Sequence, residues 1–442
     1  MIKKLFYIIL VIVGLAFALV APIDRSPLKE KSFYSAMMKE LDTLQLKSHE
    51  PNDTLQVGWS RVSLVPDYTM PMAGYTPRDS FKNIHDTLYA RILAINNGNR
   101  QVFMISLDLL LVPPVIKDNI KAKLLVQHKD DFIYFGATHT HNGLGGWQNS
   151  IGGDFIIGDY NEAWINEVTE NILVHIEKAR ASMVDTKIYY FNADADEYVN
   201  NRLAGDEGNK DGKIRGLKFE RSDGKKAVLF TYSAHATSIS KLSRSLSGDY
   251  PAEVDNELSK QGWDFPMYMA GMVGSHSLTN VEGIDFELTK NAGEILAQKI
   301  EHSKDTLLNY KLPITTSYIN VELGSSQLRI LDNWKLRDWV FRALLGKLKA
   351  EITYLRMGNI LFLGTSCDFS GELAVNSKLD SLASTHNDRA VITSFNGYYT
   401  GYITEDRHYD LFRKKEEVRA MNWVGPYYGE YYSSILKKLL DK

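Results

Sequence analysis

The chain contains 442 residues, of which 44% are hydrophobic and 24% are charged, a composition typical of globular proteins with a large core. The formal net charge is -3 and no basic cluster occurs along the chain, which argues against a nucleic-acid partner. Cys367 is the only cysteine, so intrachain disulfides and a cysteine-based zinc site are excluded.

The first 23 residues have the features of a targeting segment. Lys3 and Lys4 precede the apolar run Leu5–Ile23, which predicts a secretory signal peptide or a single membrane anchor. The small residues Ala16 and Ala18 fit a cleavage site, whereas the run is close to the roughly 20 residues that span a bilayer. Both outcomes stay open. Either one predicts that the rest of the chain lies outside the cytoplasm.

Residues 24–53 are mainly polar and contain one short helical pattern. Apolar residues recur at helical intervals within residues 33–46, which predicts a helix that packs on another part of the molecule. We expect residues 24–53 to form a stem between the targeting segment, residues 1–23, and a folded body, residues 54–442.

The folded body alternates between strand-like and helical patterns. Helical spacing predicts helices at residues 113–128 and 160–181. Strands are predicted at residues 57–59, 71–75, 85–96, 102–112, 132–137, 187–191, 217–219 and 227–233, with a hairpin turn at Asn97-Gly98-Asn99. Residues 200–216 are rich in Asn, Asp and Gly and predict a loop. Without a linker or an internal repeat, the pattern predicts one large α/β domain with mixed sheets flanked by helices.

Four strand-like runs end in small residues that are followed by a side chain able to bind a metal or attack a substrate. The run at residues 133–137 leads to His139 and His141, and the others lead to His235, Ser277 and Asp368. In α/β domains, ligand sites form where loops leave the ends of strands. The sequence therefore predicts a metal site at the strand ends.

His139 and His141 are two positions apart, and residues at this spacing point to the same face of an extended backbone. Both imidazoles can then enter one site, and neutral imidazole is a common ligand of zinc. The alternative is a pair of strand-end histidines that only make hydrogen bonds to their neighbours.

Five motifs, in order between residues 57 and 428, resemble those of the neutral/alkaline non-lysosomal ceramidases. The family's A-T-H-T-H-S-G-P-G-G is similar to residues 137–146, which read A-T-H-T-H-N-G-L-G-G. The other four motifs are similar to residues 233–249, 273–278, 366–370 and 399–405. The resemblance implies that residues 54–442 form a ceramidase-like catalytic domain.

The resemblance also implies a zinc ion held by His139, His235, Asp368 and Tyr402. Asp368 stands where the family has glutamate, so its side chain is one methylene shorter. Glu372 is therefore an alternative carboxylate ligand.

By the same resemblance, Ser277 is the catalytic serine, either as the nucleophile or as the group that positions a water molecule. His141 and Arg202 match residues that hold the amide oxygen as it becomes negative, and preorganised donors of this kind stabilise a transition state.

The implied function is a zinc-dependent amidohydrolase that cleaves the N-acyl amide of ceramide, or of a similar lipid, to a sphingoid base and a fatty acid. A lipid amide substrate and a membrane surface are the expected partners. One alternative is a metal-dependent hydrolase of another lipid amide or of an ester. The other is a membrane-tethered, non-catalytic binding protein with a degenerate site.

Overall fold

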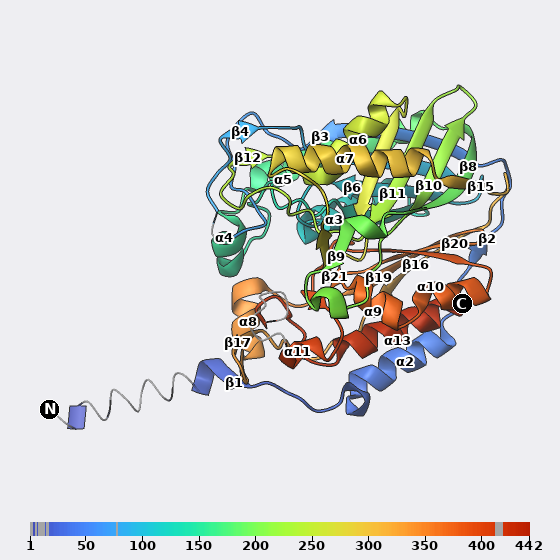
Figure 1. The fold of residues 1–442 in the computed structure, drawn as a ribbon. Coiled ribbons are helices and arrows are strands. Elements are labelled where there is room, and N and C mark those ends of the chain that lie inside the picture. The colour runs from blue at the N-terminus through green and yellow to red at the C-terminus, as the bar shows by residue number, and fades with distance from the viewer. Residues whose placement is uncertain (1–2, 5–6, 8–13, 15–16, 77, 412–418) are drawn as a thin grey trace.

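Two stacked β-sheets form the centre of the molecule, and helices cover the outer face of each sheet (Figure 1). This computed structural model describes residues 3–4, 7, 14, 17–76, 78–411 and 419–442. Among them, the larger sheet has nine strands, in the order β13 (Phe265–Ala270), β11 (Lys226–Tyr232), β10 (Lys213–Arg221), β8 (Val184–Asp194), β3 (Gln56–Ser63), β5 (Tyr89–Asn96), β6 (Gln101–Leu107) and β7 (Phe132–Ala137), with β15 (Lys304–Leu307) paired to β8. The smaller sheet has five, in the order β2 (Ser48–His49), β16 (Ile314–Asn320), β19 (Glu351–Met357), β20 (Ile360–Gly364) and β22 (Arg389–Thr393).

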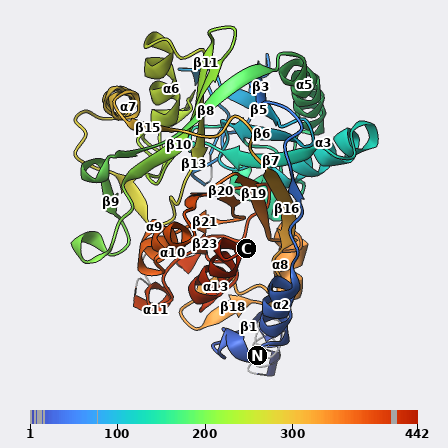
Figure 2. The same cartoon turned by 90° about the vertical axis from the view of Figure 1, so that its right-hand side faces the viewer.

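The main helices form two groups on opposite sides of the sheets (Figures 1 and 2). The larger sheet is covered by α3 (Pro114–Gln127), α5 (Glu162–Ala181), α6 (Asp249–Lys260) and α7 (Phe286–Glu301). The smaller sheet is covered by α2 (Ser32–Thr43), α9 (Gly371–Asn376), α10 (Leu379–Thr385) and α13 (Tyr428–Leu440). The remaining α-helices and strands are short: α4 (Ile151–Ile157), α8 (Asp338–Leu345), α11 (His408–Leu411), β1 (Val20–Pro22), β4 (Asn83–Ile84), β9 (Val199–Asn201), β12 (Ser245–Leu246), β14 (His276–Leu278), β17 (Arg329–Leu331), β18 (Trp334–Leu336), β21 (Asp368–Phe369) and β23 (Tyr402–Ile403).

The stacking explains why the central strands are apolar throughout. In β6, Phe103 and Ile105 belong to the core beneath the helices, whereas Val102 and Met104 belong to the core between the sheets. Successive residues of a strand point to opposite faces, so a strand buried on both faces needs apolar residues at every position. The two sheets mix parallel and antiparallel pairs, which confirms the predicted α/β class with mixed sheets.

Most predicted elements are present, with shifted ends. The hairpin of β5 and β6, the hairpin of β10 and β11, and the helices α3 and α5 are confirmed. The strand predicted at residues 71–75 is wrong, because this stretch makes only isolated bridges, from Pro71 to Ser80 and from Met72 to Leu144. The loop predicted at residues 200–216 is also partly wrong, because β10 begins at Lys213.

The two ends of the larger sheet, β7 and β13, contact each other. Ser106 Oγ on β6 donates a hydrogen bond to the Tyr268 carbonyl on β13, at 2.5 Å. Gly136 on β7 leaves room for Met269, since a Cβ there would lie 2.9 Å from that side chain. This approach brings the loops that follow β7, β11 and β13 to one place.

Residues 17–43 lie against the body, whereas the described residues before them extend away from it (Figure 1). Met37 and Leu41 of α2 are fully buried in the core that includes α13, and β1 pairs with β18. The predicted docking of this helix is confirmed, whereas the division of the chain at residues 23 and 53 stays a prediction. About half of the predicted targeting segment lies outside the described residues, and no helix within the described part is long and apolar enough to cross a membrane.

Candidate active site

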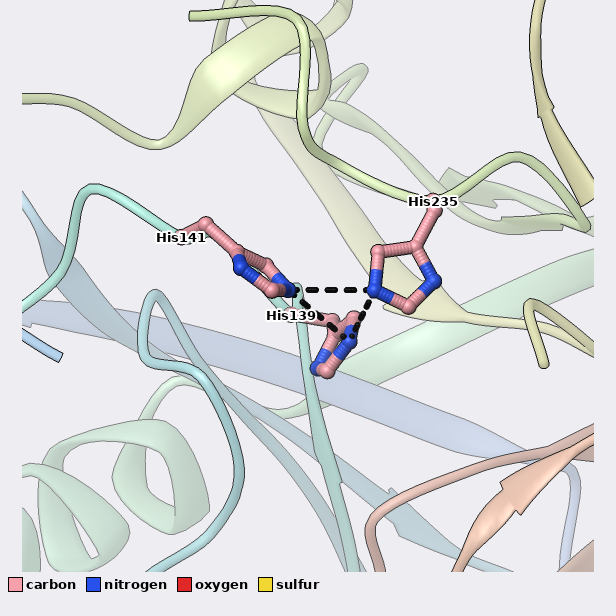
Figure 3. A group of neighbouring side chains, drawn as sticks. All are labelled: His139, His141 and His235. Carbon is pink, nitrogen blue, oxygen red and sulfur yellow. Dashed lines mark hydrogen bonds between the residues drawn. The ribbon is translucent and has the colours of Figure 1, made fainter. Parts of the chain in front are cut away.

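Three imidazoles meet where the loops leave the larger sheet (Figure 3). The Nε2 atom of His139 lies 2.8 Å from Nε2 of His235 and 3.4 Å from Nε2 of His141, and the remaining pair, His141 and His235, is separated by 3.0 Å. The three ring nitrogens therefore face one point. The structure brings His141 as close to this point as the two histidines expected to bind the metal.

His139 reaches the cluster through an unusual backbone conformation. The strand β7 ends at Ala137, and His139 has a φ of +62°, a conformation that costs about 1–3 kcal/mol for a residue other than glycine and is typical of functional sites. The expected alternation of an extended strand is thus wrong for this pair. The His139 ring stacks on Phe395, with centroids 4.0 Å apart, and its Nδ1 donates a hydrogen bond to the Leu110 carbonyl at 2.6 Å.

His141 is enclosed by the loop that precedes β4. A Cβ on Gly74 would lie 2.5 Å from the His141 Cα, and Gly74 has a φ of +112°, so only glycine allows this close approach. The Tyr75 ring lies 4.9 Å from the His141 ring, and Arg78 donates a hydrogen bond to the His141 carbonyl.

The environment keeps His141 and His235 neutral. Burial, reinforced by His139 and Arg202, lowers the pKa of His141 well below its usual value. Burial, reinforced by Arg202 and His139, has the same effect on the pKa of His235. Neutral imidazole is the form that binds a metal.

Asp368 and Tyr402 stand opposite each other in the parallel pair β21 and β23. Asp368 Oδ1 lies 3.3 Å from His139 Nε2 and, among the described residues, accepts no hydrogen bond although it is buried. Asp368 Oδ2 accepts a hydrogen bond from the Tyr399 hydroxyl at 2.5 Å. The Tyr402 hydroxyl lies 3.4 Å from His235 Nε2 and accepts a hydrogen bond from Arg202 at 3.0 Å.

The hydrogen bond of His139 leaves its Nε2 able to bind a cation. The Leu110 carbonyl can only accept a hydrogen bond, so the proton of His139 is on Nδ1 and the lone pair of its Nε2 faces the cluster. His235 Nδ1 lies 3.3 Å from the Val273 carbonyl, which accepts, and 3.1 Å from the Arg202 guanidinium, which donates, so these contacts are compatible with either tautomer of His235.

The distances between the nitrogens agree with a metal centre. Ligands about 2.0–2.1 Å from zinc in a tetrahedron lie about 3.3 Å apart, close to the observed separations of 2.8–3.4 Å between Nε2 atoms. The unsatisfied oxygen of Asp368 adds a negative ligand. The residues present therefore fit a divalent cation.

A cavity of about 810 Å³ opens beside the cluster. His139, His141, Asp368 and Tyr402 form part of its wall. Most of the remaining wall is apolar or aromatic and includes Leu110, Leu111, Val115, Trp147, Ile156, Ile157, Phe341, Leu345, Leu348, Tyr398, Tyr399 and Trp423. Apolar pockets with a few convergent polar groups are the usual form of a site for a small ligand.

Ser277 and Glu372 do not line this cavity, and their side chains bind groups outside the histidine cluster. The Ser277 hydroxyl, on β14, donates a hydrogen bond to Asn200 Oδ1 at 2.7 Å. Glu372 accepts hydrogen bonds from Arg407, His408 and Asn201 instead of facing the histidines. The structure thus places Asp368, and not Glu372, next to the cluster.

Several supporting groups were not predicted from the sequence. Asp368 is held by the Tyr399 hydroxyl, and His139 is held by the Phe395 ring and the Leu110 carbonyl. Tyr399 had a visible signal, its position three residues before Tyr402, but the crowding of tyrosines in this region was equally consistent with ordinary core packing.

Residues 65–282 match the model of a family described as neutral/alkaline non-lysosomal ceramidase, N-terminal. A neutral ceramidase of Pseudomonas aeruginosa is 21% identical over 241 residues, and this alignment covers 50% of the chain. It spans only 35%, or about a third, of that relative.

Solved structures share the fold. A crystal structure of neutral ceramidase from Pseudomonas aeruginosa aligns with a TM-score of 0.77 at 16% identity, over 89% of this chain and 74% of that one. A structure described as ceramidase complexed with C2 aligns with a TM-score of 0.73 at 14% identity, over 88% and 75% of the two chains. The family match, the curated relative and the common fold agree, and residues 65–282 of this chain belong to the neutral/alkaline non-lysosomal ceramidase family.

Proposed function

We propose that this protein is a zinc-dependent amidohydrolase that cleaves the N-acyl amide of ceramide, or of a closely similar lipid, to a sphingoid base and a fatty acid. The observation that carries the proposal is the meeting of three imidazole Nε2 atoms and a buried, unsatisfied Asp368 oxygen at the wall of an apolar cavity. Family membership favours this reaction over other uses of a metal site.

The proposed ligands are His139, His235, Asp368 and Tyr402, with His141 also within reach of the ion. When bound, the ion would polarise the amide carbonyl and lower the pKa of a water molecule. Neutral imidazoles and an ionised Asp368 are the forms that hold it.

Arg202 is the main candidate for stabilising the amide oxygen. Its guanidinium contacts the Tyr402 hydroxyl and the His235 ring, so it is fixed beside the cluster before the substrate arrives. A fixed positive charge in a site with little water stabilises developing negative charge strongly. His141, which lines the cavity, is the second candidate for this role.

Ser277 is proposed to act as the nucleophile or to position the attacking water. Its backbone bridges that of His235, which ties the serine strand to a proposed metal ligand. In either role, the hydroxyl would have to exchange its hydrogen bond to Asn200 for one to the substrate or to water.

The apolar wall of the cavity suits the alkyl chains of a lipid amide, because transfer of each CH₂ group from water stabilises binding by about 0.8 kcal/mol. We further propose that the protein acts outside the cytoplasm on lipid at a membrane surface. The apolar segment Leu5–Ile23 supports that location.

The test is the release of fatty acid from an N-acyl sphingosine dispersed in detergent, with the full chain as the enzyme. We expect hydrolysis that a chelator abolishes and added zinc restores, and a loss of at least about 100-fold in Arg202→Met. A matched ester and another N-acyl lipid run in parallel. Turnover that persists in the chelator, or that favours the ester, would refute the proposal.

A further inference from the structure

Two short helices at the cavity, α4 and α8, carry apolar side chains on both their inner and outer faces. They pack tightly, since a Cβ on Gly152 would lie 2.6 Å from a Leu345 methyl group. Inward, α4 and α8 contribute Ile157 and Phe341 to the cavity wall. Outward, Ile151, Phe155 and Trp339 are 72%, 70% and 57% exposed. Large apolar side chains gathered on one surface mark a site of interaction.

The apolar N-terminal segment ends beside the same surface. Arg337 and Trp339, on either side of the start of α8, donate hydrogen bonds to the carbonyls of Phe17 and Ala18, at 2.9 and 3.2 Å. The strand β1 then pairs with β18, and in Figure 1 β1, α4 and α8 lie on the same side of the molecule. The described end of the segment predicted as a signal or anchor is therefore held next to the exposed apolar residues.

Basic side chains border this surface. Lys241, Lys347 and Lys349 are exposed and line the cavity beside α4 and α8. Of these three lysines, Lys349 lies 4.0 Å from an Asp118 oxygen, so Lys241 and Lys347 are the main positive groups, while Asp154 on α4 carries the opposite charge. Apolar residues flanked by lysine are the pattern of proteins that lie on the surface of an anionic bilayer.

We propose that the exposed faces of α4 and α8, together with Lys241 and Lys347, form a docking surface for a bilayer that contains anionic phospholipid. The pairing of β1 with β18 holds residues 20–22, at the end of the N-terminal segment, beside this surface. In this arrangement a water-insoluble lipid amide would pass from the bilayer straight into the cavity between α4 and α8. This role in substrate entry rests on the proposed function.

The experiment places a polarity-sensitive dye on the full chain, at Ala343→Cys on the exposed face of α8. Cys367 is fully buried, so the dye reacts with the new cysteine alone. The control is Lys225→Cys, in the turn between β10 and β11. We expect vesicles of phosphatidylcholine with phosphatidylserine to shift the emission to the blue at position 343 and to leave position 225 unchanged.

The residues of the surface are tested in the Ala343→Cys background. Phe155→Ser with Trp339→Ser, or Lys241→Glu with Lys347→Glu, should raise the lipid concentration at half-response at least about tenfold. The charge-matched control, Lys187→Glu with Lys304→Glu on β8 and β15, should leave it unchanged. Equal responses at positions 343 and 225, an equal response to phosphatidylcholine alone, or a shift caused by raised protein concentration without vesicles would overturn the inference.

The same preparations separate this inference from the proposed function. A dye response without hydrolysis in detergent would reject the function and support the docking surface. Hydrolysis in detergent without a dye response would support the function and reject the docking surface.

Discussion

Each candidate ligand is oriented by a second group, and this group decides which atom faces the cluster. The Leu110 carbonyl fixes the proton of His139 on Nδ1, and the Tyr399 hydroxyl occupies one oxygen of Asp368 so that the other faces the histidines. The ligand types were predictable because they follow strand ends. Their supporting groups were not, because a backbone carbonyl such as that of Leu110 has no sequence signal and depends on the positive φ of His139.

At this scale, removal of the Tyr399 hydroxyl should weaken metal binding. In Tyr399→Phe, Asp368 loses its hydrogen bond at Oδ2 and its fixed orientation, and loss of such a partner lowers metal affinity about 10- to 100-fold. Competition with a chromophoric chelator measures the affinity. The matched control is Tyr398→Phe, whose hydroxyl binds Asp118 instead. An equal loss in both variants would contradict the role given to Tyr399.

A second prediction concerns acid stability and Glu372. Burial opposes the ionisation of Glu372, but hydrogen bonds from His408, Asn201 and Arg407 outweigh it and hold its pKa at about 2, below the usual 4.5. An acid with a lowered pKa stabilises the fold fully above pH 4.5, and this contribution of about 2–3 kcal/mol is lost as the pH falls toward 2.

The free energy of unfolding in urea, measured at pH 6 and pH 3, tests this prediction. The wild type should lose more stability between the two values than Glu372→Gln, which has no proton to bind at this position. A parallel decrease in the two proteins would show that Glu372 is not the group responsible.

Among the elements, those with a long periodic pattern were the predictable ones. The helices α3 and α5 and the hairpins around β5 and β10 lie where their spacing and turn residues indicate. The parallel pair of β21 and β23 sets Asp368 opposite Tyr402, yet each strand has only two residues. Such a pair depends on the surrounding chain, so no local pattern predicts it.

The helix α2 gives a prediction at the element scale. Leu41 is fully buried in the core shared with α13, so Leu41→Ala should lower the free energy of unfolding by about 2–5 kcal/mol. Lys39→Ala, on the exposed side of the same helix, should change it by less than about 0.5 kcal/mol. Similar values for the two variants, from urea unfolding, would show that residues 24–53 stand apart from the body.

For the molecule as a whole, the alternation of strand and helix patterns predicted the α/β class but not the stacking of two sheets. Strands buried on both faces, such as β6, look alike whether helices or a second sheet cover them. The contact between β7 and β13 could not be predicted from the sequence either, because it involves one glycine, Gly136, that makes room for one methionine, Met269. Because β11 pairs with β13, this approach also brings the end of β11, which precedes His235, close to the end of β7, which precedes His139.

The central claim is that these distant segments together hold one divalent cation. The most direct test is the metal content of the purified full chain, measured by mass spectrometry beside His235→Ala and, as a control, His302→Ala, an exposed histidine at the end of α7. The account predicts about one zinc per chain in the wild type and in His302→Ala, and little or none in His235→Ala. A wild-type protein without stoichiometric metal, or a content unchanged by His235→Ala, would contradict it.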